Sequence, residues 1–231
     1  MAKQARSART REALVRAAAS VFDDAGYEGT ALARISEAAD ISMGALTFHF
    51  SSKKALAEEV QEQGVATTRR VVEQVAATRG ASPLETVVSV TLALATLLGR
   101  DPLVRAAARL ARERTDSACD WSDCWLPTVE QLTALAAESE CPGRDDRATV
   151  VALAQLLVAG AEAHIRGAAR AENGPDLSGE FARIWEAMLR GITARPLVRP
   201  EPGRDEVSDG APSPCEAREL TVAGRVPAEA R

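Results

Sequence analysis

The sequence predicts an all-α protein. Its 231 residues are 46% hydrophobic but only 3% aromatic, so the core must be built chiefly from Ala, Leu and Val. Apolar residues recur every three or four positions over most of residues 8–194, as on the buried face of a helix. Residues that start helices, including one Ser-Pro-Leu-Glu capping sequence, precede several of these stretches. These three observations favour packed helices over a sheet.

The first expected helix spans residues 8–25 and follows a loose basic arm, residues 1–7. Gly26 ends this helix, because glycine adopts the left-handed conformation without strain. Tyr27, the only tyrosine in the chain, is expected either to pack in the core or to approach a phosphate group.

Two short helices joined by a tight turn follow. We expect Thr30 to cap the first of them and Ser42 to cap the second, which spans residues 43–49. Ser52 starts a long helix over residues 53–78. Two short helices with such a turn are typical of a helix-turn-helix, whose second helix enters the DNA major groove.

Further helices are expected over residues 83–98, 102–114, 125–139 and 145–171, and a last one carries the apolar residues from Phe181 to Ile192. Ser82 and Asp101 cap the first two of these helices, and each is followed by a proline at the first helical position. Pro127 must lie in a first turn. Residues 195–231 lose the pattern, hold six of the eleven prolines, and are expected to be disordered.

The segments FDDAGYEGT (residues 22–30), ISMGALTFHF (41–50) and SKKAL (52–56) occur in the order found in one known family. On these segments, residues 9–56 resemble the DNA-binding domain of the TetR family of bacterial repressors. The GALTFHF segment and the end of the first helix are most similar to the γ-butyrolactone receptors of actinomycetes. The resemblance implies a helix-turn-helix domain, residues 1–52, and a helical ligand-binding and dimerisation domain, residues 53–194.

DNA binding requires cations and donors near phosphates, and short side chains that reach base edges. The candidate phosphate contacts are Arg9, Thr30, His49, Lys53 and Lys54, and His49 has an alternative role as a packed or capping imidazole. The candidate base-reading residues are Ser42, Met43, Ala45 and Thr47, and Gly44 is small enough to let the backbone approach the groove. Related receptors commonly carry Lys in place of Met43 and Tyr in place of Thr47, so two expected contacts are missing. Both residues can still contact a thymine methyl group.

The resemblance also implies that the second domain holds a small effector between its helices. Trp125 matches a tryptophan that shapes the pocket in the receptors, and its alternative is a plain core residue. The other residues expected near the pocket are Thr91, Leu92, Thr128 and Gln155. Such domains dimerise through their last two helices, and the interface residues expected here are Val158, Phe181, Trp185 and Met188.

Other classes of function are disfavoured. Neither histidine belongs to a catalytic motif, and the sequence contains no G-x-S-x-G, Walker, H-E-x-x-H or G-x-G-x-x-G pattern, so we expect no enzyme. The four cysteines form no C-x-x-C pair, so we expect no metal site and no cofactor. A net charge of −5 argues against indiscriminate coating of nucleic acid. Without an unbroken apolar run of 18 residues or a signal peptide, the chain is expected to be cytoplasmic, with no membrane contact.

The sequence therefore predicts a homodimeric transcriptional repressor that binds a palindromic double-stranded DNA operator. A small γ-butyrolactone-like or antibiotic effector is expected to release it, in the control of secondary metabolism or antibiotic biosynthesis. The alternative is a helical small-molecule-binding or adaptor protein with weakened or lost DNA binding, which the identities of Met43 and Thr47 keep open.

Overall fold

The computed structural model describes residues 2–114, 120–139, 144–168 and 177–193, and every regular element in these ranges is helical. The prediction of an all-α protein is confirmed. These residues belong to one compact unit, residues 1–195. The tail expected to be disordered, residues 195–231, lies outside the described ranges.

The helix-turn-helix prediction agrees with the first three helices, which are α1 (Ala2–Ala25), α2 (Leu32–Ala38) and α3 (Met43–His49). Helix α1 begins in the segment that we expected to be a loose arm. Gly26 ends α1 with φ at +73°, as predicted, and its N–H donates to the carbonyl of Phe22 (2.9 Å). Asp40 lies in the turn between α2 and α3 with φ at +52°, a conformation that Asp tolerates better than most residues.

The remaining elements are α4 (Lys53–Ala76), α5 (Pro83–Arg100), α6 (Pro102–Glu113), the short 3-10 helix η1 (Trp121–Cys124), α7 (Leu126–Ser139), α8 (Arg144–Ala168) and α9 (Leu177–Thr193). The predicted N-caps are confirmed at four helices, α3, α4, α5 and α6. Ser42, Ser52, Ser82 and Asp101 each accept a hydrogen bond from a backbone N–H in the first turn. Pro127 lies in the first turn of α7, where its missing N–H costs nothing.

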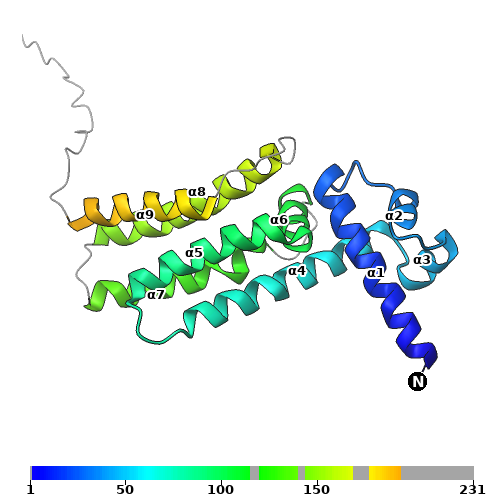
Figure 1. The fold of residues 1–231 in the computed structure, drawn as a ribbon, viewed down its shortest axis with the longest axis horizontal. Coiled ribbons are helices and arrows are strands. Elements are labelled where there is room, and N and C mark those ends of the chain that lie inside the picture. Colours follow the sequence, from blue (N-terminus) through cyan, green and yellow to red (C-terminus); the bar gives the residue numbers. More distant parts are fainter. Residues whose placement is uncertain (1, 115–119, 140–143, 169–176, 194–231) are drawn as a thin grey trace, which may run out of the picture. The chain divides into compact units, whose positions relative to one another are not determined.

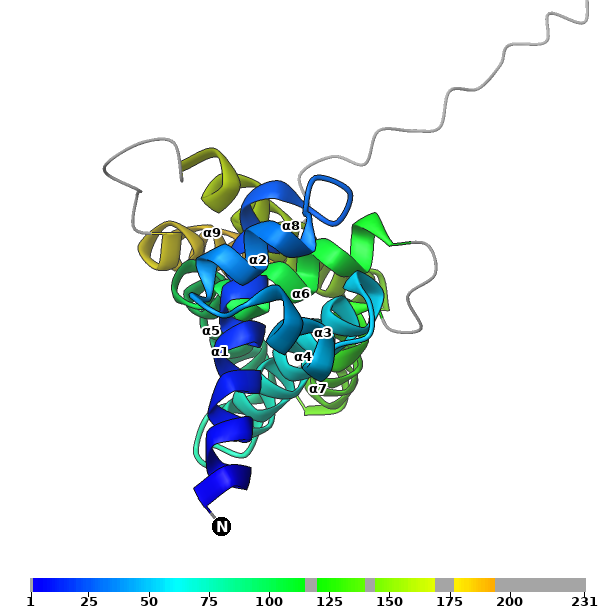
Figure 2. The ribbon, with the colours of Figure 1, turned by 90° about the vertical axis from the view of Figure 1, so that its right-hand side faces the viewer.

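One core holds α1, α2 and α3 together. Its buried members include Leu14 and Phe22 of α1, Ile35 of α2, Leu46 of α3 and Val60 of α4. Figure 2 shows α2 and α3 beside α1, with α4 and α6 behind them. We call the part of the chain formed by α1, α2 and α3 the headpiece, and this group of side chains the headpiece core. It fixes the direction in which α3 presents its outer side.

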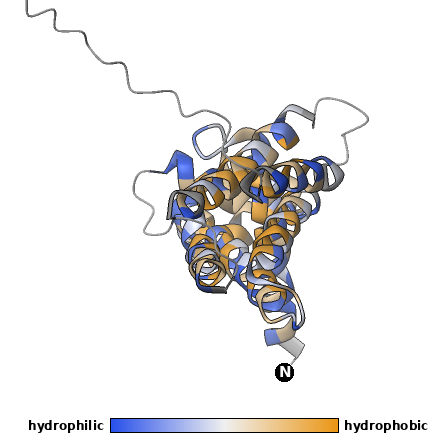
Figure 3. Cartoon of the chain, turned by 90° about the vertical axis from the view of Figure 1, so that its left-hand side faces the viewer, coloured by the Kyte–Doolittle hydropathy of each residue, from blue (hydrophilic) through white to orange (hydrophobic). Residues whose placement is uncertain are grey.

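A second core, the regulatory core, is organised around α5. Helix α5 contacts α4, α7, α8 and α9. Figure 1 shows α4 continuing from the first three helices alongside these later ones. The apolar faces of the helices turn toward one another and their hydrophilic faces turn outward (Figure 3).

Helix α6 takes part in both cores. Its Ala106 and Leu110 are buried in the headpiece core, whereas Val104, Ala107 and Ala108 are buried in the regulatory core. Helix α4 approaches α6 closely at Gly64, where a Cβ atom would lie 2.4 Å from the Cβ of Ala107 and 2.8 Å from the carbonyl oxygen of Leu103. A side chain larger than hydrogen at this position would push the two helices apart.

Two of the described helices, Pro83–Arg100 and Arg147–Gly167, are long and apolar enough in composition to cross a membrane. The first is α5 itself, which contributes five buried residues, Val87, Val90, Leu94, Ala95 and Leu98, to the regulatory core. A central helix of a helical domain needs this composition, so its hydropathy is explained by packing inside the protein.

Candidate functional site

Helix α3 turns one side to the headpiece core and the other to solvent. Leu46 is fully buried, and the hydroxyl of Ser42 accepts the N–H of Ala45 (3.3 Å), which fixes the start of the helix. The outer face consists of Met43, Gly44, Thr47 and Phe48, all of which are exposed. None of these four residues carries a charge. The outer face therefore offers van der Waals surface and a single hydroxyl group.

Phe48 is the functional candidate that the sequence analysis missed. Its side chain is 82% exposed, and its ring meets the ring of His49 edge-on, with the centroids 5.3 Å apart. Phe48 follows Gly44 by four residues, so the two share one face of the helix. This spacing could have identified it, but an apolar residue is assigned to the core by default.

Three of the predicted phosphate contacts are at least partly accessible and come from α1, α3 and α4. Arg9 and Lys54 are exposed, and His49 is half-buried. Lys54 Nζ lies 4.0 Å from a carboxylate oxygen of Glu58, and the Lys54 side chain is 52% exposed. Their contact with DNA stays a prediction.

Lys53 has a structural task in addition to its predicted one. Its ammonium group donates to the backbone carbonyl of Tyr27 (2.9 Å) and lies 4.3 Å from the centroid of the Tyr27 ring. The guanidinium carbon of Arg114 lies 5.1 Å from that centroid, and the ring stacks on Phe22. Tyr27 therefore packs between the headpiece core and two cations, which agrees with the packing alternative.

Thr30 does not cap α2, and this part of the prediction is wrong. The N-cap is Ala31, which makes no side-chain cap. The Thr30 side chain is buried, and its hydroxyl donates to the carbonyl of Gly26 (2.6 Å) at the end of α1. Because the proton is used inside the chain, Thr30 has none to offer to a phosphate.

Several headpiece cations are paired with carboxylates. Arg16 pairs with Glu12 (2.8 Å), and Arg34 pairs with Asp24 (2.6 Å). Arg11 binds both carboxylate oxygens of Glu59. The hydrogen bond from Arg11 holds the pKa of Glu59 below its ordinary value. These pairs reduce the positive charge that the headpiece presents to DNA.

Helix α6 is joined to the end of α1 by two arginines. Arg105 Nε donates to the carboxylate of Asp23 (2.7 Å), and its Nη1 donates to the carbonyl of Leu98 at the end of α5 (2.9 Å). Arg109 Nη1 donates to the carbonyl of Asp23 (2.6 Å). Arg105 thus connects the headpiece with α5 through one guanidinium group.

Glu113 completes this joint between α1 and α6. Its carboxylate accepts the N–H of Tyr27 (2.7 Å) and the guanidinium of Arg109 (2.5 Å). Burial alone would raise the pKa of Glu113, but the hydrogen bonds from Arg109 and Tyr27 outweigh burial and hold it below its ordinary value. A Cβ atom at Gly26 would lie 2.6 Å from the same carboxylate and would move that side chain, and the φ of +73° favours glycine there as well.

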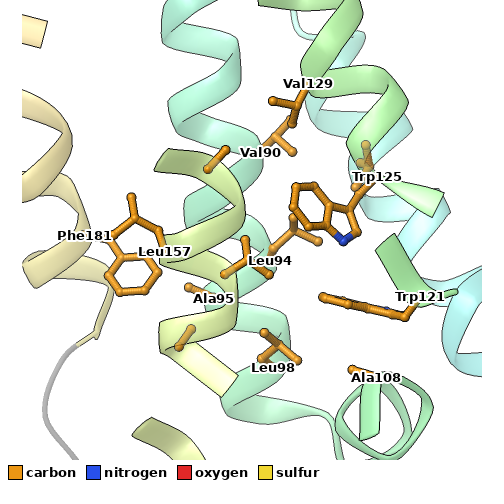
Figure 4. Close-up of a cluster of buried hydrophobic side chains, with 14 of the residues drawn as sticks. Val90, Leu94, Ala95, Leu98, Ala108, Trp121, Trp125, Val129, Leu157 and Phe181 are labelled. Carbon is orange, nitrogen blue, oxygen red and sulfur yellow. The ribbon is translucent and has the colours of Figure 1, made fainter. Parts of the chain in front are cut away.

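Trp125 and Trp121 lie together in the regulatory core, with their ring centroids 6.1 Å apart (Figure 4). Trp121 Nε1 donates to the hydroxyl of Thr68 (3.0 Å). Trp125 Nε1 is equally buried, but it has no hydrogen-bond partner among the described residues. Beside them, burial raises the pKa of the Cys124 thiol to about 11, so this cysteine stays protonated and unreactive near neutral pH.

Comparisons with known proteins identify the family. Residues 14–60 match the family described as bacterial regulatory proteins, tetR family. The chain is 32% identical to the A-factor receptor protein of Streptomyces griseus, over all of this chain and 81% of the relative. The chain belongs to the TetR family of bacterial regulatory proteins.

Solved structures of TetR-family proteins share the fold. A crystal structure of an ArpA-like γ-butyrolactone receptor is 29% identical and covers 80% of this chain and 89% of its own, with a TM-score of 0.65. CprB from Streptomyces coelicolor in complex with its biological operator sequence is 27% identical at the same coverage, with a TM-score of 0.66. The predicted resemblance is confirmed. The relatives found are regulators and receptors rather than enzymes.

Within this TetR-family fold, the residues predicted to contact the effector are only partly brought together. Trp125 is buried, and Leu92 and Thr128 are half-buried, so their contact with an effector stays a prediction. Thr91 is buried, but its hydroxyl accepts the indole N–H of Trp185 (2.8 Å) and donates to a carbonyl of its own helix. Gln155 is exposed on α8, which contradicts its expected place beside an interior pocket.

The residues predicted for the dimer interface need a similar correction. Val158, Phe181 and Trp185 are buried within their own chain, in the regulatory core. The helical spacing identified an apolar face correctly, but that face packs against α5 of the same subunit. Met188 is half-buried, and its interface role stays a prediction. The side of α8 that remains exposed carries Leu156, Ala159, Gly160 and Ala163.

Proposed function

We propose that this TetR-family chain is a cytoplasmic, homodimeric repressor that binds a palindromic operator and releases it when a small effector enters the regulatory core beside Trp125. The family membership, a relative named as an A-factor receptor, and similar structures of γ-butyrolactone receptors support this proposal. A similar structure with an operator sequence bound supports the DNA-binding half. Control of secondary metabolism or antibiotic biosynthesis is the setting we propose.

The observation that carries the effector site is the buried indole N–H of Trp125, which meets no acceptor in the part of the chain that the structure describes. A buried donor without an acceptor costs about 1–3 kcal/mol, and a neighbouring indole in the same core avoids that cost by donating to Thr68. A ligand with a carbonyl oxygen on a mostly apolar body would supply the missing acceptor. The ring of a γ-butyrolactone has this chemistry, and so do many antibiotics.

Release of DNA follows from a coupled equilibrium. An effector that prefers the conformation with misplaced α3 helices weakens operator binding by the ratio of its affinities for the two conformations. The contacts between α6 and the end of α1, made by Arg105, Arg109 and Glu113, connect the regulatory core to the headpiece. We propose that they transmit the change.

The effector site is tested with Trp125→Phe, which keeps an aromatic ring and removes the N–H. We expect effector affinity to fall about 2- to 13-fold, the value of one net hydrogen bond of about 0.5–1.5 kcal/mol. Operator binding without effector should be unchanged. Trp125→Ala should cost about 5- to 150-fold, because it also removes the ring. Both measurements are fluorescence-anisotropy titrations of labelled operator with candidate lactones and antibiotics.

Trp121→Phe serves as the matched control, because the indole N–H of Trp121 is already bonded to Thr68. Loss of operator binding by Trp125→Phe itself would show that Trp125 is a core residue only. Normal release of operator by this variant would place the effector elsewhere.

The operator itself is expected to contain two half-sites separated by about one helical turn, ~34 Å, or a multiple of it. Arg9→Ala should weaken binding to all sequences alike and reduce the slope of log affinity against log salt by about one. Ser20→Ala, at an exposed uncharged residue of α1, is the control for unrelated changes in this helix. A gel shift over a range of salt concentrations measures both.

We propose that the subunits associate through the exposed side of α8 and the neighbouring surface of α9. Leu156 is 70% exposed and Ile184 is 43% exposed in the single chain. The small residues Ala159 and Gly160 lie beside Leu156 and let a second helix approach closely. This proposal keeps the last two helices as the dimer interface but assigns the contact to a different face of each helix.

The alternative function, a helical ligand-binding or adaptor protein with lost DNA binding, is favoured by one observation. The headpiece arginines Arg11, Arg16 and Arg34 are paired with carboxylates. A gel shift with the promoter upstream of the protein's own gene separates the two functions, because only the repressor forms a complex that survives competitor DNA.

A further inference from the structure

The outer face of α3 is unusual for a surface that contacts DNA, because it contains no charged residue. Met43 is 43% exposed and Phe48 is 82% exposed. The hydroxyl of Thr47 donates to the carbonyl of Gly44 (3.1 Å), so its proton is used within the helix. The exposed cations Arg9 and Lys54 lie on other helices, α1 and α4. The exposed cations predicted to contact phosphates therefore lie on elements other than α3.

Base edges in the major groove present mainly hydrogen-bonding groups, and the C5-methyl group of thymine is the one apolar exception. Guanine and adenine are usually read by Arg, Lys, Asn or Gln, none of which occurs in α3. A phenylalanine that stays in water gains nothing for the fold of the free chain. The surface of Phe48 and Met43 matches the methyl group and no other base-edge feature.

We propose that Phe48, together with Met43, reads thymine C5-methyl groups in each operator half-site and thereby sets the sequence preference of this protein. The inference rests on the DNA binding proposed above and specifies its chemistry. Base recognition is then dominated by burial of apolar surface, and the phosphate contacts from α1 and α4 hold the helix in place without selecting bases.

The test begins with selection of a binding site from random double-stranded DNA by the full-length chain. Each thymidine of the selected site is then replaced by deoxyuridine, which removes the methyl group and keeps the hydrogen-bonding pattern. At the contacted positions we expect affinity to fall about fourfold for one half-site and about fifteenfold for both. These values follow from ~0.8 kcal/mol per buried methyl group and 1.4 kcal/mol per tenfold.

The variants assign the effect to the side chains. At the position that Phe48 contacts, the Phe48→Ala variant should bind the thymidine site and the deoxyuridine site with equal affinity. Met43→Ala should do the same at the position that Met43 contacts, which is either the same position or another one in the half-site. Both should melt like the parent, because neither side chain is buried in the free chain. Leu135→Ala, at a residue 46% exposed on α7, should keep the full preference for thymidine.

Four results would overturn the inference. A selected site whose thymidines can all be replaced without loss would show that methyl groups are not read, while DNA binding itself stands. A preference for thymidine that survives in both variants would assign the contact to other residues. Failure to enrich any sequence would refute the proposed DNA binding and this inference together, and loss of self-association by Phe48→Ala would identify a second copy as the occupant of this face.

Discussion

Substitution of Gly44 by alanine should change stability and DNA binding in opposite directions. A Cβ atom at Gly44 would meet no atom within 4 Å, and the backbone there has no left-handed φ. Alanine therefore fits without strain. Because alanine loses less conformational entropy than glycine in a helix, the free energy of unfolding should rise by about 0.5–1 kcal/mol.

For a domain of this size, each 1 kcal/mol corresponds to roughly 2–4 °C, so the melting temperature should rise by about 1–4 °C. The added methyl group would lie on the outer face of α3, where we predict that the backbone approaches the groove of DNA. We expect operator affinity to fall at least about tenfold, since even a small displacement of the helix lengthens several contacts at once. Thermal unfolding followed by circular dichroism and a gel shift with the selected operator provide the two measurements.

Gly99→Ala is the matched control. Gly99 lies in α5, also has no atom within 4 Å of an added Cβ, and is far from α3 in the sequence. This variant should gain similar stability and bind operator like the parent. Unchanged operator affinity in Gly44→Ala would refute the close approach of α3, and reduced stability would refute the described geometry of the helix.

Three further predictions concern the regulatory core, the dimer and the joint. Thr91→Val should lower the free energy of unfolding by about 1–3 kcal/mol in urea titrations, because the buried N–H of Trp185 loses its acceptor, whereas Thr91→Ser should keep most of the stability. Leu156→Glu should give folded monomers by light scattering and circular dichroism, since a carboxylate in an apolar interface costs several kcal/mol; Leu135→Glu should remain dimeric, and dimers in both would refute the proposed face. The pKa of Glu113 is depressed below its ordinary value of 4.5, so its contribution to stability is complete above that pH and is lost as the pH falls through the folded-state pKa. Urea unfolding between pH 3 and 6 should therefore show a steeper acid loss in the parent than in Glu113→Gln, and parallel curves would contradict the joint.

The sequence predicted the features that depend on neighbouring residues. Ser42, Ser52 and Ser82 cap helices where expected, because a cap bonds to a backbone N–H only three residues away. Gly26 ends α1 for an equally local reason. Thr30 failed as a cap because α2 begins one residue later, with Ala31 at the N-cap, and the buried Thr30 hydroxyl donates back to the carbonyl of Gly26.

The sequence could not reveal which neighbour covers an apolar face. Helical spacing marked Phe181 and Trp185 as one side of a helix, but the same pattern arises from burial against α5 or against a second subunit. The partner that decides, Thr91, lies 94 residues away from Trp185 in the chain. Phe48 was missed because a phenylalanine in a helix is expected to be buried, and the sequence alone does not show that this one has no neighbour covering it in the described chain.

The division of α6 between two cores limits how this protein can be taken apart. A segment that contains only the first three helices and part of α4 would lack Leu110 and Ala106, which fill the interior beneath α1. The empty space would cost about 2–5 kcal/mol, as a buried leucine truncated to alanine does. Chimaeras that exchange DNA-recognition segments between regulators should therefore carry a matching α6. Its Ala106 and Leu110 positions must suit the headpiece core, and its Val104, Ala107 and Ala108 positions must suit the regulatory core. In engineering terms, the exchangeable part of this chain is discontinuous in sequence.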